Sequence, residues 1–363
     1  MRFEGATLLL TGEHIKENRR IYMQRRMIML TLAIGIALMF VSSAAMAQYQ
    51  LTNLVSNQVG QAKNTDPLLV NAWGLVHAPG SPFWISDNAT GWETLYTGTG
   101  AKIGLEVVVP SASGKGPGSP TGVVFNGSPD GEFQVAGWPS IFIFATLDGT
   151  ISGWAPQSNP NQAIIAATNA GTSYTGLAIT NNPSGNMLFA ADNAGNKVDM
   201  YDGTFTWKGS FTDATVPTGF SVLNVQDLNG LLYVSYAATN GGPGGFIDIF
   251  SEGGVFLKRL AQGGPLNQPW GFAAAPRVFG ALSNTLLISN NVNNGTINGF
   301  NAITGEFVGS VRDKNGKLIT IDQLWGIEFG GGTAANGAQN ELFFTAGPSN
   351  NQAGTFGVIR FTP

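Results

Sequence analysis

The dipeptide Trp-Gly recurs in one local pattern at three distant places in the chain. The three segments are "LVNAWGL" (69–75), "LNQPWGF" (266–272) and "IDQLWGI" (321–327). Each has a polar residue two positions before the tryptophan and an apolar residue after the glycine. A pattern that returns at such distances indicates an internal repeat, and a repeat constrains the fold more strongly than composition does.

The glycine of this pattern, which we call the anchor, aligns the repeats. Anchors fall at 74, 122, 176, 224, 271 and 326, at spacings of 48, 54, 48, 47 and 55 residues, with Asn224 in place of glycine. Each opens a short apolar strand, and a second apolar strand follows. The third strand alternates apolar with polar residues, as in "GTINGF" (295–300), and several units add a fourth, such as "IGLEVVV" (103–109).

Six units of roughly 50 residues with four strands each predict an all-β fold, a six-bladed β-propeller. An array of β-sandwiches is the runner-up, but it does not need Trp-Gly at this period. The last unit ends after its third strand, whereas "YQLTNLVS" (49–56) stands alone before the first anchor. We expect this N-terminal strand to complete the last blade, because closing the ring removes an open sheet edge.

A targeting segment precedes the repeats. Arg25 and Arg26 stand before an apolar run at 27–41, and "SSAAMAQ" (42–48) has the small residues that a signal peptidase recognises. We predict a signal peptide cleaved after Ala47. A start at Met23 gives a typical signal of this kind, and the sequence does not decide between Met1, Met23 and Met27 as the true start. The alternative, a membrane anchor, is disfavoured because the run is short and no basic flank follows.

The sequence therefore predicts two parts of the chain. Residues 1–47 form an N-terminal extension plus signal peptide, and residues 48–363 form a single propeller domain. We expect a protein exported to the periplasm or the exterior, with no membrane span in the mature chain. Beyond residue 47 the chain has 12 Lys and Arg against 19 Asp and Glu, a net charge of −7. An acidic surface without basic clusters argues against binding nucleic acid or anionic lipid.

Several segments together resemble an uncharacterised family of exported bacterial proteins related to NHL-type six-bladed propellers. They include "TDPLLVNAWGL", "PFWISDNATGWETLY", "FATLDGTISGW", "LNQPWGFAAAP" and "LFFTAGP", and the resemblance covers nearly all of 49–363. Some members of that family end in a PEP-CTERM sorting segment, whereas this sequence ends in "IRFTP". The resemblance implies a propeller fold and brings no established activity or site residue with it.

Neutral polar residues recur three positions before each anchor, where inner strands of a propeller begin. They are Asn71, Ser119, Ser173, Ser221, Gln268 and Gln323. One interpretation is a ring of hydrogen-bonding groups that binds a ligand at the mouth of the central channel. The other is that these side chains cap strand starts and nearby backbone groups, as Asn and Ser do in turns. The tryptophans of the pattern are interpreted as packing between blades.

Carboxylates follow the second strand in several units, and oxygen ligands of this kind suit Ca²⁺. The candidates are Asp87, Asp148, Asp192 and, before the last inner strand, Asp322. Ca²⁺-dependent lactonases and phosphotriesterases are six-bladed propellers, so the likeness to them is one of fold alone. The "DN" and "DG" segments also read as ordinary hairpin turns, and turn chemistry is the preferred interpretation.

Two functions remain open from the sequence. The chain has no cysteine and one histidine beyond residue 47, His77, which argues against Ser-His-Asp or Cys-His catalysis. The preferred function is a non-catalytic binding protein that holds a small molecule, a glycan or a protein loop at the channel mouth. We expect no cofactor for it. The alternative is a Ca²⁺-dependent hydrolase of lactones or phosphoesters.

Overall fold

The computed structural model describes residues 48–128, 131–180 and 185–362, together with Glu17, Arg20, Tyr22 and Met23. The chain divides into two units, Met1–Met46 and Ala47–Pro363. The four described residues of the first unit are helical. The apolar run at 27–41 and the predicted cleavage site after Ala47 lie outside the described residues. In the part of the chain that is described, no helix combines the length and apolar character needed to cross a membrane.

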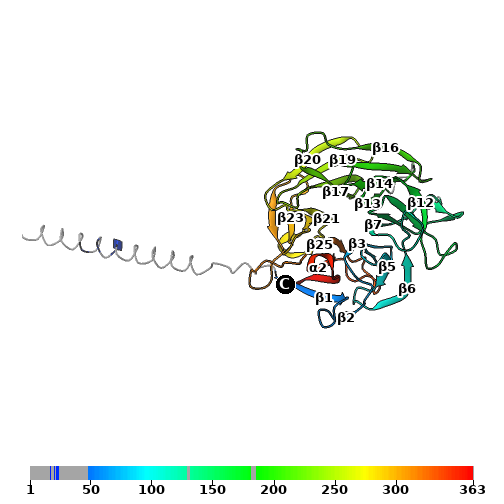
Figure 1. Ribbon diagram of the computed structural model, residues 1–363. Coiled ribbons are helices and arrows are strands. Elements are labelled where there is room, and N and C mark those ends of the chain that lie inside the picture. Colours follow the sequence, from blue (N-terminus) through cyan, green and yellow to red (C-terminus); the bar gives the residue numbers. More distant parts are fainter. Residues whose placement is uncertain are drawn as a thin grey trace, which may run out of the picture. The chain divides into compact units, whose positions relative to one another are not determined.

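The second unit is nearly all β, with six sheets arranged in a ring, as a six-bladed β-propeller requires (Figure 1). The predicted fold is therefore confirmed. Blade one consists of β3 (Ala72–His77), β4 (Phe83–Asp87), β5 (Trp92–Tyr96) and β6 (Lys102–Val108). Blade two consists of β7 (Pro120–Phe125), β10 (Phe142–Thr146), β11 (Thr150–Trp154) and β12 (Ile164–Thr168). Blade three consists of β13 (Tyr174–Ile179), β14 (Met187–Asp192), β15 (Lys197–Asp202) and β16 (Trp207–Phe211).

The other three blades follow the same order, from the inside of the ring outward. Blade four consists of β17 (Phe220–Asp227), β18 (Leu231–Ala238), β19 (Phe246–Ser251) and β20 (Phe256–Gln262). Blade five consists of β21 (Pro269–Ala274), β22 (Leu286–Asn290), β23 (Ile297–Phe300) and β24 (Phe307–Ser310). Blade six consists of β25 (Leu324–Phe329), β26 (Glu341–Ala346), β27 (Thr355–Thr362) and β1 (Gln48–Ser56), with the short β2 (Asn64–Thr65) parallel to β1.

Short elements decorate the ring. They are the hairpin of β8 (Gln134–Val135) and β9 (Trp138–Pro139), the 3₁₀ turn η1 (Gly280–Leu282) and the single turn α2 (Pro348–Asn351). The second strand of each blade is buried on both faces, which explains its unbroken apolar sequence. Outermost strands such as β16 are largely exposed, which explains their mixed composition.

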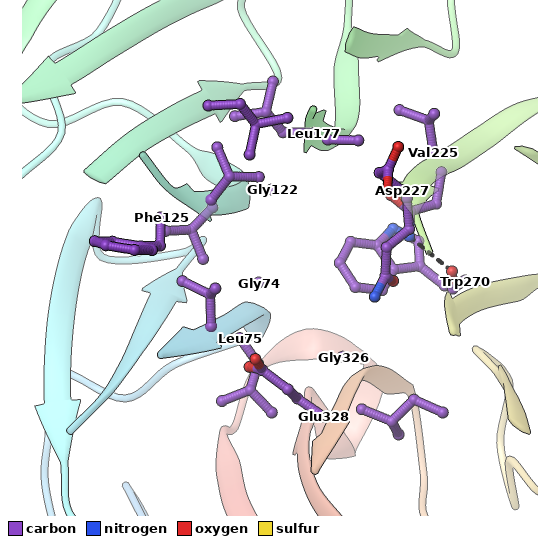
Figure 2. A pocket seen from close by; sticks show the side chains of 18 of the residues that line it. Gly74, Leu75, Gly122, Phe125, Leu177, Val225, Asp227, Trp270, Gly326 and Glu328 are labelled. Carbon is purple, nitrogen blue, oxygen red and sulfur yellow. Dashed lines mark hydrogen bonds between the residues drawn. The ribbon is translucent and has the colours of Figure 1, made fainter. Parts of the chain in front are cut away.

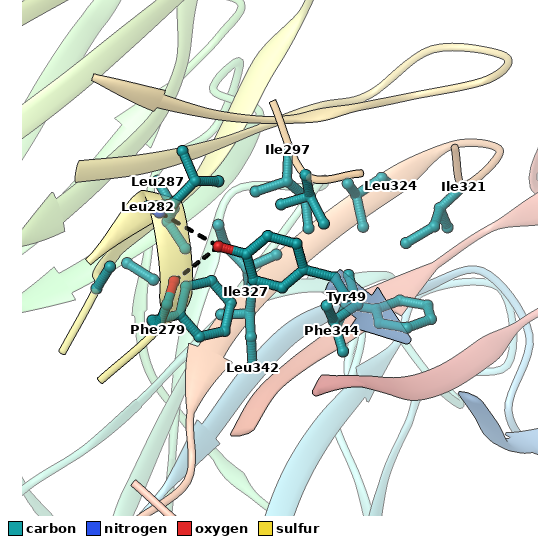
Figure 3. Close-up of a cluster of buried hydrophobic side chains, with 14 of the residues drawn as sticks. Tyr49, Phe279, Leu282, Leu287, Ile297, Ile321, Leu324, Ile327, Leu342 and Phe344 are labelled. Carbon is teal, nitrogen blue, oxygen red and sulfur yellow. Dashed lines mark hydrogen bonds between the residues drawn. The ribbon is translucent and has the colours of Figure 1, made fainter. Parts of the chain in front are cut away.

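The N-terminal strand closes the ring as predicted. β1 pairs antiparallel with β27, from Gln48 opposite Thr362 to Ser56 opposite Thr355. The side chain of Tyr49 continues inward to a buried cluster between blades five and six (Figure 3). Its hydroxyl donates a hydrogen bond to the carbonyl of Phe279 at 2.7 Å and accepts one from the amide of Leu282 at 3.3 Å. The first strand is therefore held by its own blade and by its neighbour.

The anchor glycines allow adjacent inner strands to approach closely. The pairing register shifts at each of these positions, for example between Leu324 and Ile327 in blade six. A Cβ atom on Gly326 would lie 2.9 Å from the carbonyl oxygen of Trp73, and one on Gly271 would lie 2.7 Å from that of Trp325. Real Cβ atoms do not come this close to backbone, so the spacing of blades five, six and one depends on glycine.

Candidate functional site

Three tryptophans from different blades meet inside the ring of inner strands. Trp73, Trp270 and Trp325 form one buried group, which we call the tryptophan cluster, with Leu147 and Leu223 packed against it. Trp73 stacks on Trp325 with ring centroids 3.6 Å apart, and Trp270 meets both edge-on at 6.4 and 5.8 Å. The tryptophans do contact other blades, as the sequence suggested, but they do so by filling the channel.

Hydrogen bonds fix the tryptophan cluster. The Nε1 of Trp270 donates to the carbonyl of Thr175 in β13 at 2.9 Å, so this side chain reaches from blade five to blade three. The Nε1 of Trp325 donates to Oδ1 of Asn71 at 3.2 Å. Asn224, the one anchor that is not glycine, donates to the carbonyl of Trp270 at 2.7 Å. The cluster and its hydrogen-bond partners form a packed and bonded unit across five blades.

The six predicted rim residues lie where the inner strands begin, on one side of the tryptophan cluster. Asn71, Gln268 and Gln323, which precede the three Trp-Gly pairs, all have left-handed backbone angles, with φ of 52°, 51° and 51°. The Nδ2 of Asn71 donates to Oδ1 of Asn88, and Nε2 of Gln268 donates to the carbonyls of Ala238 and Gly242. These amides bond to neighbouring loops, as the capping interpretation expects.

The other rim residues are placed in similar ways. The Nε2 of Gln323 donates to Oδ1 of Asn293, and Oγ of Ser221 donates to the carbonyl of Asn193. The carbonyls of Ser119 and Ser173 accept hydrogen bonds from Leu147 and Asn193 in their own blades. Ligand binding by these six residues stays a prediction.

Asparagines in the turns after the second strands connect the blades, a role that the sequence did not reveal. The Nδ2 of Asn88 donates to the carbonyl of Pro120, that of Asn193 to Val222, and that of Asn291 to Leu324. In each case the acceptor belongs to the inner strand of the next blade. The recurrence of asparagine at this turn position was the available signal, but the sequence suggested only Ca²⁺ ligands or hairpin turns for it.

Of the four carboxylates proposed as metal ligands, Asp87 and Asp192 end the second strands of their blades, and Asp148 and Asp322 lie in turns. Thr94 donates to Asp87, Ala112 to Asp148, Ser173 and Gly195 to Asp192, and Asn294 to Asp322. Asp87 and Asp192 are buried, whereas Asp148 and Asp322 are exposed. Among the residues that the structure describes, no group of three or more His, Cys, Asp or Glu side chains is placed to hold a metal ion. Metal binding by these four residues stays a prediction.

A cavity of about 320 Å³ lies in the channel on the other side of the tryptophan cluster (Figure 2). Its wall consists of Trp270 and of residues 74–77, 122–125, 177–179, 224–227 and 326–328. All the inner-strand segments in this wall begin at or after an anchor, whereas the predicted rim residues precede the anchors. The cluster therefore separates the cavity from the rim, and no rim residue is found among those that line it.

The wall of the cavity is mixed, with apolar side chains beside a somewhat larger share of polar surface. Glu328 and Asp227 face it from different blades, on opposite sides in Figure 2. Oε2 of Glu328 and Oδ2 of Asp227 are buried without a hydrogen-bond partner among the described residues. The residues that line the cavity include no lysine or arginine. A ligand with an apolar body and polar ends would match this wall.

Burial governs the ionisation of both carboxyl groups. It raises the pKa of Glu328 well above its ordinary value, and a hydrogen bond from the backbone of His77 opposes the shift only in part. Burial also raises the pKa of Asp227, while the amide of Gly230 lowers it and the charge of Glu252 raises it further. Perturbed acids in a cavity are typical of functional sites.

His77 is held in place beside Glu328. Its Nε2 lies 3.1 Å from the carbonyl of Phe329 and 3.6 Å from Oε1 of Glu328. Its Nδ1 lies 3.2 Å from both the carbonyl of Ala78 and Nδ2 of Asn336. Both ring nitrogens are therefore engaged by the protein, and His77 acts here as a fixed part of the wall.

Glu328 and Asp227 were not among the candidate site residues predicted from the sequence. Two positions after the anchors stand Val76, Val124, Ala178, Gln226, Ala273 and Glu328. Polar residues at this position occur only in units four and six, and a Glu inside an otherwise apolar inner strand was the signal that could have found the site.

Comparisons with known proteins give relatives but no activity. No family model matches the chain. "Uncharacterized protein R648" of Acanthamoeba polyphaga mimivirus is 29% identical over 344 residues, which cover 87% of this chain and 81% of that protein. "Uncharacterized protein L690" of the same virus is 27% identical over 306 residues, covering 78% and 79%. These relatives are viral, so they do not support a bacterial origin or a sorting segment.

Solved structures share the fold. A "glucose dehydrogenase" aligns with a TM-score of 0.54 at 10% identity, covering 85% of this chain and 98% of that one. A Bacteroides thetaiotaomicron protein of unknown function aligns at 0.53 and 10% identity, covering 86% and 76%. A streptogramin B lyase aligns at 0.50 and 12% identity, covering 88% and 100%. These TM-scores show a shared propeller architecture. Because the identities are this low, the activities of those proteins cannot be assigned to this chain.

Proposed function

We propose that the protein is an exported, non-catalytic binding protein that holds a small molecule in its central cavity. The observation that supports this most directly is the 320 Å³ space between the tryptophan cluster and the ends of the inner strands. Ligand pockets of proteins start at about this volume, and they combine apolar walls with a few polar groups. The cavity has a volume in this range and a wall that contains both apolar side chains and polar groups.

The wall suggests the chemistry of the ligand. Leu75, Val123 and Leu177 supply apolar surface, and Asp227 and Glu328 supply carboxyl groups at separate places. A small molecule with an apolar body could direct polar groups toward these two carboxyls. Those groups would supply the hydrogen bonds that the buried carboxyl oxygens lack. Recognition of a glycan or a protein loop by the six rim residues would use the opposite end of the channel.

Export is the second part of the proposal. It rests on the basic pair at 25 and 26, the apolar run at 27–41 and the small residues before Gln48. N-terminal sequencing of the protein from its native host tests it: a mature chain that begins at Gln48 supports export, and a chain that retains residues 27–47 contradicts it.

Binding is favoured over catalysis by the state of the candidate groups. His77 has both ring nitrogens occupied by protein atoms. No group of three or more His, Cys, Asp or Glu side chains among the described residues is placed to hold the Ca²⁺ ion of the alternative hydrolase. Thermal unfolding with Ca²⁺ and with EDTA separates the two functions. A metal bound at a hundredfold excess over its Kd would add about 2.7 kcal/mol, so a Ca²⁺-dependent rise in Tm would favour the hydrolase.

The cavity itself is tested by a small-molecule screen followed by thermal unfolding, using the full chain and the variant Leu75→Trp. Leu75 is half-buried and lines the cavity, so an indole there fills the space. We expect compounds that raise the Tm of the wild type and leave that of L75W unchanged. Leu257→Trp is the control, because Leu257 is 50% exposed on the outermost strand of blade four. Compounds that stabilise L75W as strongly as the wild type would contradict the proposal.

A further inference from the structure

A second hollow, of about 570 Å³, lies where blade three meets the end of blade two. Three aromatic residues line it, Tyr201, Phe205 and Trp207, and three polar residues, Thr168, Asn169 and Lys197. The residues come from the end of β12 and from β15 and β16 with the turn between them. None of them lines the central cavity, so the two sites are independent.

Trp207 is the unusual member of this group. Its side chain is 53% exposed, although tryptophan is normally buried in this protein, as Trp73, Trp270 and Trp325 are. It is the first residue of the outermost strand of its blade. A large aromatic surface left in contact with water beside polar groups is typical of a binding site.

A buried carboxylate fixes the polar groups around Trp207. Asp199 is fully buried, and its Oδ1 accepts a hydrogen bond from Nε1 of Trp207 at 3.3 Å and from Nζ of Lys197 at 2.8 Å. Its Oδ2 accepts hydrogen bonds from Nδ2 of Asn169 at 3.1 Å and from the hydroxyl of Tyr174 at 2.9 Å. The hydroxyl of Tyr174 also lies 2.7 Å from that of Tyr201. One acid therefore orients the indole, the amide and the ammonium group before any ligand arrives.

The charges in the hollow favour a neutral ligand. Lys197 is its only cationic lining residue among those described, and it is paired with Asp199 at 2.8 Å and with Asp192 at 3.9 Å. Two carboxylates therefore offset one ammonium group, which leaves no free positive charge for a phosphate or a carboxylate ligand. The other polar side chains that line the hollow are the amide of Asn169 and the hydroxyl groups of Thr168 and Tyr201.

We propose that this hollow binds a neutral sugar residue, with one face of the sugar ring against the indole of Trp207 and its hydroxyl groups hydrogen-bonded to Asn169, Lys197 and Thr168. A pyranose ring presents C–H groups on its face and hydroxyl groups on its edge. That combination matches an exposed aromatic plane bordered by fixed polar side chains. An apolar ligand would displace water from the polar border without supplying hydrogen bonds in its place, and an anion would meet the carboxylates.

Isothermal titration calorimetry tests the assignment with four neutral oligosaccharides, cellohexaose, laminarihexaose, xylohexaose and mannohexaose, and with hexagalacturonate as the anionic counterpart. We expect the full chain to bind at least one neutral sugar and to bind hexagalacturonate more weakly. Trp207→Ala should weaken binding about tenfold or more, because a central aromatic contact contributes over 1 kcal/mol. Trp207→Phe should retain part of the affinity, because it keeps an aromatic plane.

Phe307→Ala is the matched control. Phe307 is 49% exposed and is also the first residue of an outermost strand, β24, but it does not line the hollow. F307A and the cavity variant L75W should bind the sugar as the wild type does. Three results would overturn the proposal: no binding of any of the four neutral sugars, tighter binding of hexagalacturonate, or unchanged affinity in W207A with its fold verified by circular dichroism.

Discussion

The indole of Trp325 stacks on the indole of Trp73, with ring centroids 3.6 Å apart. The two residues belong to the last and first blades, and Trp270 of blade five packs edge-on against both. The recurring Trp-Gly pattern thus supplies two things at once, an aromatic group that fills the channel and a glycine that lets the next blade approach. The filled channel has two separate ends, and only one of them carries the 320 Å³ cavity.

Removal of one tryptophan from the cluster should destabilise the whole propeller. Trp270→Ala loses two ring contacts and the hydrogen bond to Thr175, and we expect a loss of about 3–5 kcal/mol in the free energy of unfolding. Trp138→Ala is the control, because Trp138 is 48% exposed, and it should change stability by less than about 0.5 kcal/mol. Urea unfolding followed by circular dichroism measures both. Equal small effects would show that the cluster is not a structural unit.

An added methyl group should distinguish two glycines. In Gly326→Ala the new Cβ would lie 2.9 Å from the carbonyl oxygen of Trp73 and 3.0 Å from Cβ of Leu75, and we expect a cost of about 1–3 kcal/mol. In Gly104→Ala, on the outermost strand of blade one, nothing lies within 4 Å. That variant should be neutral or more stable by up to about 1 kcal/mol, because alanine restricts the unfolded chain. Thermal unfolding would contradict the close-approach account if both variants behaved alike.

The hydroxyl of Tyr49 should contribute to closure of the ring. Tyr49→Phe leaves the carbonyl of Phe279 and the amide of Leu282 without their partner, and we expect a loss of about 1–3 kcal/mol. Tyr233→Phe is the control, because the hydroxyl of Tyr233 makes no hydrogen bond to the described residues, and its removal should have little effect. Deletion of 48–56 should be far more damaging. An unchanged melting curve for that deletion would refute closure by β1.

The number of blades and the closure by β1 could be predicted because they depend on spacing along the chain. A repeat of this length, with an orphan strand at the start, leaves few alternatives. The convergence of Trp73, Trp270 and Trp325 could not be predicted in the same way, because a strand pattern tells which residues alternate but not which face is turned to the axis. The directions in which the three tryptophan side chains point also depend on left-handed backbone angles at Asn71, Gln268 and Gln323.

The central cavity was missed for a related reason. Neutral residues before the anchors recur in all six units, and that regularity suggested a ligand ring. Structure-supporting residues recur because every blade needs them, as Asn88 and Asn193 show by bonding to the next blade. Asp227 and Glu328 do not recur, and they face the cavity. In a repeat protein of this kind, the departures from the repeat were the better guide to the candidate site.

Stability should fall with rising pH in a way that depends on Glu93. This residue is fully buried in blade one, and burial raises its pKa well above the ordinary value, although a hydrogen bond from Ser86 opposes the shift. The folded state therefore retains a proton that the unfolded state releases above a pH of about 4.3. The contribution to stability is full below that pH and is lost as the pH rises toward the folded-state pKa.

Glu93→Gln removes that titration. The stability of E93Q relative to the wild type should increase between pH 4 and pH 8, by at most about 1.4 kcal/mol for each pH unit. Glu306→Gln is the control for the loss of one carboxylate at an exposed position. Denaturant unfolding at a series of pH values measures this. A parallel curve for E93Q would mean that Glu93 is ionised in the folded protein.

The measurement that tests the binding proposal most directly is a crystal structure with the best compound from the small-molecule screen. The account predicts electron density for the ligand in the central cavity, in contact with Asp227 and Glu328, with the tryptophan cluster intact beside it. Density at the opposite end of the channel, among Asn71, Gln268 and Gln323, would contradict this proposal. It would instead show that the ligand binds at the rim of neutral residues.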